Sequence, residues 1–282
     1  MKLAKLHGLG NDFLIVKAGG PGDPGLPLGA VAQRACHRHT GIGADGVIFY
    51  QPTVGDGDAD VSALIFNADG SRAEMSGNGT RCLAAHLVRT CEVEADVIRI
   101  RTVCGIKSYA LKSRSGSVYI FESSLGHPVT DPARIPVRLG SGAELVDFPL
   151  AVGHESVRVT ITSMGNPHCS TFWPDVARAP LESLGPVLER HECFPNRCNV
   201  EFIQVLDRHR IRVRFWERGV GPTSASGTGS SAAAVAAILN HHVDSPVEIE
   251  AELGRLRVDW RPPGELMLNG PAEYICDVDF PA

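Results

Sequence analysis

The sequence lacks long apolar runs and clusters of basic residues. No stretch of the 282 residues approaches the roughly 18 consecutive apolar residues of a membrane-spanning helix, so we expect no membrane partner. Its 27 Lys and Arg residues are outnumbered by 32 Asp and Glu residues and form no basic run, which argues against nucleic acid as a partner. The first residues, MKLAKLHGLGNDF, contain no long apolar segment, so we expect no signal peptide.

Close pairs of cysteines are also missing. The eight cysteines are scattered and none forms a Cys-x-x-Cys pair, which favours reduced, buried thiols in a cytoplasmic protein over a disulfide framework. Cys193 and Cys198 flank FPNR and His191 lies nearby, but a second pair of ligands at zinc spacing is absent. We therefore expect no metal site.

The nucleotide-binding motifs are incomplete. Gly227–Ala232 (GTGSSA) fits the pattern Gly-x-Gly-x-x-Ala, but ERGVGPTSA intervenes after the strand expected to end at Trp216. The dinucleotide fingerprint requires a strand directly before its first glycine, and neither Gly-rich loop continues into Gly-Lys-Ser/Thr. Nucleotide binding is therefore the weaker interpretation of these glycines.

The sequence does contain a duplicated motif. Glu74–Val88 reads EMSGNGTRCLAAHLV, and residues 224–239 read SASGTGSSAAAVAAIL. Ser76 and Ser226 occupy the same place in the two copies, 150 positions apart. A chain of this length fits two domains of about 140 residues, so the offset indicates two related halves.

Each half combines short strands with one unusually apolar helix. We expect helices over Leu28–His37 and Pro180–His191 and after each Ser-Gly-x-Gly motif, the first of these beginning after Gly79. The helices that follow the motifs are apolar on almost every side, which is typical of buried helices. Strands are predicted from β-branched runs between turn residues: KLAKL, FLIV, GVIFY, VSALIF, VIRIRT, SYALK and VYIFE in the first half, and VRVTIT, VEFIQV, RIRVRFW, VEIEAEL, RLRVDW and ELML in the second.

The predicted fold class is therefore α+β, with two pseudo-symmetric domains, each a β-sheet or barrel wrapped around a central helix. The turn-rich segment Ser123–Pro136 is the expected linker. We place the first domain at residues 1–124 and the second at residues 125–269.

A Ser-Gly-x-Gly motif at a helix start is suited to binding anions. The first turn of a helix has unpaired N–H groups and a partial positive charge, and glycine lets a ligand approach the backbone closely. Two such loops facing one cleft could hold a small anionic molecule. Taken alone, Ser76 and Ser226 could equally be ordinary helix N-caps.

The sequence around these loops resembles the diaminopimelate epimerase family over nearly the whole chain. Nine blocks carry the resemblance in the family's order: HGLGNDF, TGIGADG, FNADGS, MSGNGTRC, MGNPHC, PNRCNVEF, ERGVGPT, SGTGSSA and GPAEY. It implies a site in the cleft between two domains, a C-terminal tail (270–282) that returns to the first domain, and a homodimer. The implied activity is interconversion of LL- and meso-diaminopimelate in lysine and peptidoglycan biosynthesis, by two-base transfer of the α-proton with no cofactor and no metal.

The chain departs from the family at the two bases. The family has cysteine at the positions of Ser76 and Ser226, and Cys82 lies too far into the helix to replace either. An unperturbed thiol is about 3% ionised at pH 7, whereas an alcohol is a weaker acid by several units. Neither serine begins a Ser-x-x-Lys sequence that would activate it. Three interpretations remain open: an epimerase with both cysteines replaced and little or no activity, a natural relative isomerising another small carboxylic acid, or a silent amino-acid-binding protein.

The resemblance also implies further site residues. His168 and Glu217 would tune the pKa of the bases, and Glu217 could also bind the α-ammonium group. Arg218 would pair with the distal carboxylate, and the Gly46 position lacks the side-chain contact that the family can place there. Other substrate contacts are expected from side-chain amides and from backbone N–H groups in the loops: Asn11, Asn67, Asn166, Asn199, Gly77, Asn78, Gly227 and Thr228.

Overall fold

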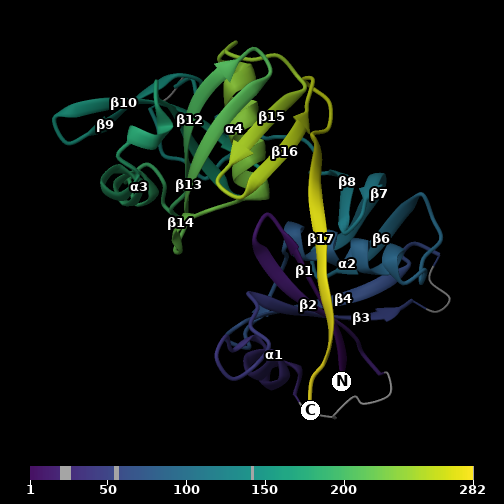
Figure 1. Ribbon diagram of the computed structural model, residues 1–282. Coiled ribbons are helices and arrows are strands. Elements are labelled where there is room, and N and C mark those ends of the chain that lie inside the picture. The colour runs from purple at the N-terminus through teal and green to yellow at the C-terminus, as the bar shows by residue number, and fades with distance from the viewer. Residues whose placement is uncertain (20–26, 54–56, 141–142, 282) are drawn as a thin grey trace. The chain divides into compact units, whose positions relative to one another are not determined.

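The computed structural model in Figure 1 describes residues 1–19, 27–53, 57–140 and 143–281. The chain divides into two compact units. The first combines Met1–Ser123 with Asn269–Ala282, and the second is the continuous segment Ser124–Leu268. Within the described residues, no helix is long and apolar enough to cross a membrane.

The strands of the first unit form a closed barrel. Pairing runs in the order β1–β2–β3–β4–β6–β7–β8–β17 and returns to β1, so eight strands complete the circle. The pairs β2–β3 and β4–β6 are parallel. The strands are β1 Lys2–Gly8, β2 Asn11–Lys17, β3 Gly46–Pro52, β4 Val61–Asn67, β6 Val97–Thr102, β7 Gly105–Ser115, β8 Val118–Ser124 and β17 Met267–Asp279, with a short β5, Arg72–Ala73, beside β4.

Two parts of the chain that are far apart in sequence meet in this barrel. Strand β17 lies antiparallel to β1, from the pair Lys2–Asp279 to the pair His7–Glu273. On its other side β17 pairs with β8. The end of the sequence is therefore part of the first unit (Figure 1).

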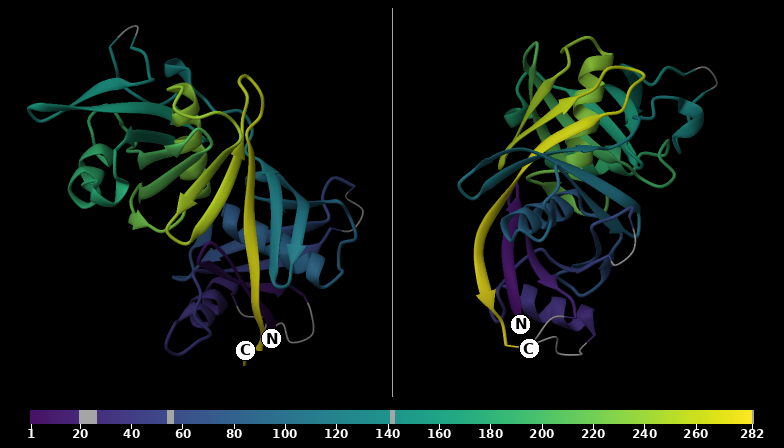
Figure 2. Two further views of the ribbon diagram at one scale, coloured as in Figure 1. Left: turned by 45° about the horizontal axis from the view of Figure 1, so that its top comes forward. Right: turned by 90° about the vertical axis from the view of Figure 1, so that its right-hand side faces the viewer.

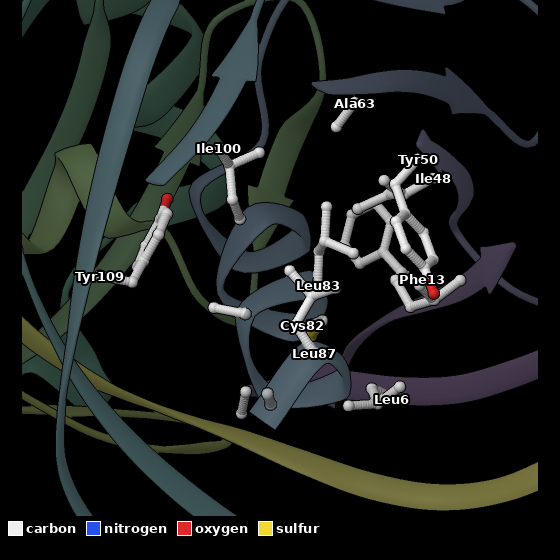
Figure 3. Close-up of a cluster of buried hydrophobic side chains, with 14 of the residues drawn as sticks. Leu6, Phe13, Ile48, Tyr50, Ala63, Cys82, Leu83, Leu87, Ile100 and Tyr109 are labelled. Atoms are coloured by element: carbon white, nitrogen blue, oxygen red, sulfur yellow. The ribbon is translucent and has the colours of Figure 1, made fainter. Parts of the chain in front are cut away.

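Helix α2, Gly77–Arg89, fills the centre of the barrel. Every residue from Gly79 to Leu87 is buried. Figure 3 shows Leu83 and Leu87 among side chains from surrounding strands, including Leu6, Ile48 and Ile100. A helix enclosed by strands needs apolar residues all around, which explains the composition of CLAAHLV. A second helix, α1, Leu28–Cys36, packs on β3 and β4 in a separate cluster with Val47 and Phe49.

The second unit repeats this plan. Its helix α4, Gly227–Leu239, is buried from Gly229 to Ala237 and contacts six strands of the unit, among which it lies in Figure 2. Helix α3, Leu181–Glu189, packs on β12, β13 and β14. Two 3-10 helices are short, Pro132–Arg134 and Val176–Arg178. The strands are β9 Phe148–Val152, β10 Glu155–Ser163, β11 Pro167–Phe172, β12 Asn199–Asp207, β13 Arg210–Glu217, β14 Gly221–Thr223, β15 Val247–Ala251 and β16 Gly254–Asp259.

The predicted α+β class, with a helix inside the strands of each half, is confirmed. Three helices have bounds that differ from the prediction, and the first of them, α1, ends at Cys36 rather than His37. Helix α2 begins at Gly77 rather than after Gly79, because Ser76 caps it and draws both glycines of the motif into the first turn. Helix α3 is shorter at both ends than Pro180–His191. The sequence did not predict β5, β9, β11 or β14, nor the length of β17.

Candidate active site

The two Ser-Gly-x-Gly segments have the same local geometry. Ser76 has φ −140° and ψ 114°, and Ser226 has φ −142° and ψ 124°. The Oγ of Ser76 accepts a hydrogen bond from the N–H of Gly79 at 3.0 Å, and the Oγ of Ser226 accepts one from Gly229 at 3.2 Å. Both serines are therefore helix N-caps, as the capping interpretation predicted.

The first two N–H groups of each helix remain free to bind a ligand. These belong to Gly77 and Asn78 in α2 and to Gly227 and Thr228 in α4. Among the described residues, none of the four backbone N–H groups has an acceptor, as expected at a helix start. With the positive end of the helix dipole, each pair forms a half-site that favours an anion.

The first half-site includes two of the predicted asparagines. Asn78 Nδ2 lies 3.4 Å from Asn11 Oδ1, although the two residues are 67 positions apart. Asn11 Nδ2 donates to Asp45 Oδ2 at 2.8 Å, and Arg38 pairs with Asp45 Oδ1 at 2.7 Å. Helix α2, strand β2 and the segment before β3 thus hold these amides in one chain of contacts.

Asn67 and Gly46 lie side by side at the ends of β4 and β3. The side-chain amide of Asn67 donates to Ser71 Oγ at 2.9 Å, so in this structure it stabilises its own turn. A Cβ at Gly46 would lie 2.7 Å from the carbonyl oxygen of Phe66 and 3.0 Å from the ring of Phe13. The backbone therefore leaves no room for a side-chain ligand at Gly46.

In the second unit, His168 is fully buried at the start of β11. Its Nδ1 lies 2.6 Å from Glu201 Oε1, and its Nε2 lies 3.0 Å from Asn166 Oδ1. The second oxygen of Glu201 accepts from Ser170 Oγ at 2.9 Å. The carboxylate fixes the orientation of the imidazole ring, which in turn positions the amide of Asn166.

The remaining predicted residues cluster around the hairpin of β13 and β14. Asn199 Oδ1 accepts from the backbone N–H of Arg218 at 3.0 Å, and its Nδ2 donates to the carbonyl of Pro167 at 3.3 Å. Glu217 Oε1 accepts from Thr223 Oγ1 at 3.0 Å. The guanidinium of Arg218 is exposed and bonds only a backbone carbonyl, that of Asn196, among the residues the structure describes.

Sequence reasoning missed several buried charged residues near the predicted site residues: Glu201 beside His168, Asp12, Glu189 and Arg81. Glu189, 2% exposed, accepts hydrogen bonds from Trp216 Nε1 and from the N–H of Gly219, and so holds the turn after Arg218. Burial would raise the pKa of Glu189, but these two hydrogen bonds hold it below its ordinary value. Arg81, 2% exposed, lies in the second turn of α2. The sequence could have indicated Arg81, because it is a charged residue within a largely apolar helical segment.

Cys82 does not replace either base. Cys82 is fully buried, and burial raises the pKa of its thiol to about 12. All eight cysteines are free. Cys193 Sγ lies 3.1 Å from His191 Nδ1, while Cys198 Sγ donates to the carbonyl of Leu188, and the described part of the chain holds no group of three residues arranged to bind a metal ion.

The structure changes one argument against nucleotide binding, namely that no strand lies directly before the glycines of the second motif. A three-residue strand, β14, directly precedes the loop before α4, where the sequence predicted none. It is the returning arm of an antiparallel hairpin with β13. In the dinucleotide fingerprint the strand before the glycines begins a parallel βαβ unit, so β14 does not restore that motif.

Comparison with known proteins gives one consistent family. The family model described as diaminopimelate epimerase matches residues 3–129 and 160–275. The diaminopimelate epimerase of Moorella thermoacetica is 43% identical over 282 residues, covering 100% of this chain and 99% of the relative. That of Synechococcus elongatus is 43% identical over 276 residues, covering 98% of this chain and 96% of the relative.

Solved structures share the fold at low sequence identity. A phenazine biosynthesis protein of the PhzF family from Bacillus anthracis has a TM-score of 0.66 at 15% identity, covering 99% of this chain and 98% of the other. A hydroxyproline epimerase from Agrobacterium vitis has a TM-score of 0.62 at 16% identity, covering 99% of this chain and 91% of the other. With two capped helix starts, the matched motifs and full-length relatives above 40% identity, this chain belongs to the diaminopimelate epimerase family of isomerases.

Proposed function

We propose that this chain binds diaminopimelate and that its two half-sites address one α-carbon from opposite faces. The supporting observation is the duplicated geometry of Ser76 and Ser226, each beside two free N–H groups. Inversion at carbon requires a proton to leave one face and arrive on the other, so two equivalent helix starts suit the reaction. The N–H groups would stabilise the negative charge that develops on the carboxylate.

The other residues fall into roles at the two ends of the substrate. Asn11 and Asn78 would bind beside the first loop, and Asn166 and Asn199 beside the second. Arg218 is exposed and makes no ion pair in the described chain, so it could receive the distal carboxylate. Glu217 has one oxygen engaged by Thr223, which leaves the other for the α-ammonium group. His168 would act through Asn166, and we assign Asn67 a weaker role, because its amide stabilises a turn.

We propose that the chain has lost epimerase activity because serine occupies the positions of both bases. Each serine hydroxyl accepts a backbone N–H, and no carboxylate, imidazole or amine accepts its proton among the described residues. A neutral alcohol is several pKa units less acidic than a thiol, and each unit corresponds to about 1.4 kcal/mol. The chain would therefore bind the substrate of its family with little or no epimerisation.

We also propose that the protein is a cytoplasmic homodimer that binds diaminopimelate, a compound of lysine biosynthesis, without pyridoxal phosphate. The free thiols fit a reducing compartment. Sedimentation equilibrium of the full chain tests the dimer, and a monomer at micromolar concentration would contradict it.

The test of the function is exchange of the α-proton of LL-diaminopimelate in D₂O, followed by NMR. The chain is compared with its Ser76→Cys/Ser226→Cys variant. We expect no measurable exchange with the serines, and both exchange and epimerisation with the cysteines. Absence of exchange in both proteins would contradict the substrate assignment and would favour another small carboxylic acid or a purely binding role.

A further inference from the structure

Arg81 is a buried cation without a buried anion. Its Nε donates to the carbonyl of Pro271 at 2.9 Å and its Nη2 to Asn78 Oδ1 at 2.6 Å. No carboxylate of the described residues lies within ion-pair distance of its guanidinium. Buried charges are normally paired, because removing a charge from water is costly. The positive charge of Arg81 is thus uncompensated close to the start of α2.

The second half-site has no equivalent charge. Because the two motifs are 150 positions apart, the counterpart of Arg81 is Ser231, whose Oγ donates to the carbonyl of Gly227 at 2.9 Å. The two helix starts therefore share their caps and differ in charge. Helix α4 thus has the same kind of cap without a charged residue in its first two turns.

Arg81 also determines how the neighbouring amides face. A guanidinium only donates hydrogen bonds, so the atom of Asn78 that contacts it must be the oxygen. Asn78 Nδ2 then faces Asn11 Oδ1, and Asn11 Nδ2 donates to Asp45. Each amide oxygen thus accepts one of these hydrogen bonds, and each amide keeps one N–H without an acceptor among the described residues.

We propose that Arg81 is a positioning residue that makes the first half-site selective for a carboxylate. It fixes the orientation of the Asn78 amide so that one side-chain N–H stays available, and it adds positive charge behind the free backbone N–H groups of Gly77 and Asn78. Without Arg81 the amide of Asn78 can turn over and present an acceptor, which suits a carboxamide or an ammonium group. This inference rests on the proposed function, since it names the substrate group that this half-site selects.

The experiment measures dissociation constants by calorimetry for LL-diaminopimelate and for its diamide, in which both carboxylates are carboxamides. The proteins are the full chain, Arg81→Met, Arg81→Lys and the control Arg89→Met, which changes an arginine at the other end of α2. We expect Arg81→Met to weaken diaminopimelate binding at least tenfold and diamide binding less than threefold. Arg81→Lys should recover part of the loss, and Arg89→Met should change neither constant more than threefold.

An unchanged preference for diaminopimelate over the diamide in Arg81→Met would overturn the inference and leave the proposed function standing. If Arg81→Met does not fold, Asn78→Asp replaces it, because an aspartate pairs with the buried guanidinium while removing the N–H donors. At least a tenfold loss of diaminopimelate binding is expected there, and unchanged binding would overturn the inference.

A ligand-free measurement separates this inference from the proposed function. The side-chain amide resonances of Asn78 should move in Arg81→Met and stay in place in Arg89→Met. If the full chain does not bind diaminopimelate, the proposed function fails. The amide resonances of Asn78 then test by themselves whether Arg81 positions Asn78.

Discussion

At the scale of single residues, the two serine hydroxyls cap helices at the positions where the resemblance places the bases. In Ser76 and Ser226 the Oγ accepts an N–H that the helix itself cannot satisfy. A cysteine sulfur is a weaker acceptor than a hydroxyl. Restoring the thiols of the family should therefore lower stability while it raises reactivity.

Removing the caps should make this contribution measurable. We expect Ser76→Ala and Ser226→Ala each to reduce the free energy of unfolding by about 1 kcal/mol, and the double variant by about 2 kcal/mol, because the two sites are independent. Urea unfolding followed by circular dichroism provides the values. The control, Ser156→Ala on an exposed position of β10, should stay within about 0.5 kcal/mol. Losses no larger than that of the control would contradict the capping role.

At the scale of elements, the two ends of α2 have different chemistry. The first turn presents two backbone N–H groups without acceptors among the described residues, whereas the last turns contain the buried imidazole of His86, whose Nε2 lies 3.2 Å from the hydroxyl of Tyr50. Burial, and after it the charge of Arg89, lowers the pKa of His86 to about 4, although the charges of Glu92 and Asp277 act in the opposite direction. His86 is therefore neutral in the folded chain at physiological pH.

This predicts a dependence of stability on pH. Between about pH 6.5 and 4 the unfolded chain binds a proton at His86 and the folded chain does not, so stability falls as the pH decreases through this window. The loss attributable to His86 is up to about 3 kcal/mol. Urea midpoints at pH 7.5 and 4.5 should differ less for His86→Gln than for the unchanged chain. Equal differences would show that His86 is not buried in its neutral form.

The sequence predicted the elements whose signal is local. Short β-branched runs gave the main strands, and an apolar composition identified α2 and α4 as internal helices. Strand β17 was underestimated, because Gly270-Pro271 and its acidic residues are typical of a loop, and only pairing with β1 and β8 makes them a strand. The contact of Asn11 with Asn78 could not be predicted from spacing, since barrel closure creates it. The motifs identified the caps, but the uncompensated charge of Arg81 required the structure.

At the scale of the whole molecule, the first unit is discontinuous and the second is not. Strand β17 completes the barrel, and it supplies Ala272 to the core and the carbonyl of Pro271 to Arg81. Its Asp277 pairs with Arg89 near the end of α2. Residues 269–282 therefore stabilise the first unit, although all its other residues precede residue 124.

A chain that ends at Leu268 tests this dependence. We expect residues 2–123 to lose protection against hydrogen exchange, because β1 and β8 lose a partner and the core around α2 opens to water. Residues 124–268 should keep the protection they have in the full chain, which serves as the control. Exchange measured by mass spectrometry distinguishes the two units, and unchanged protection of α2 would show that the barrel is stable without β17.

The return of β17 to β1 also determines the order in which the protein can fold during its synthesis. As the chain leaves the ribosome, the first unit emerges early but its barrel stays open, with one edge of β1 unpaired until residues near Asp279 appear. The second unit ends at Leu268, so it is complete eleven residues before Asp279 is added. The half encoded first is thus the half finished last, and its open edge is exposed to association with other nascent chains for nearly the whole of translation.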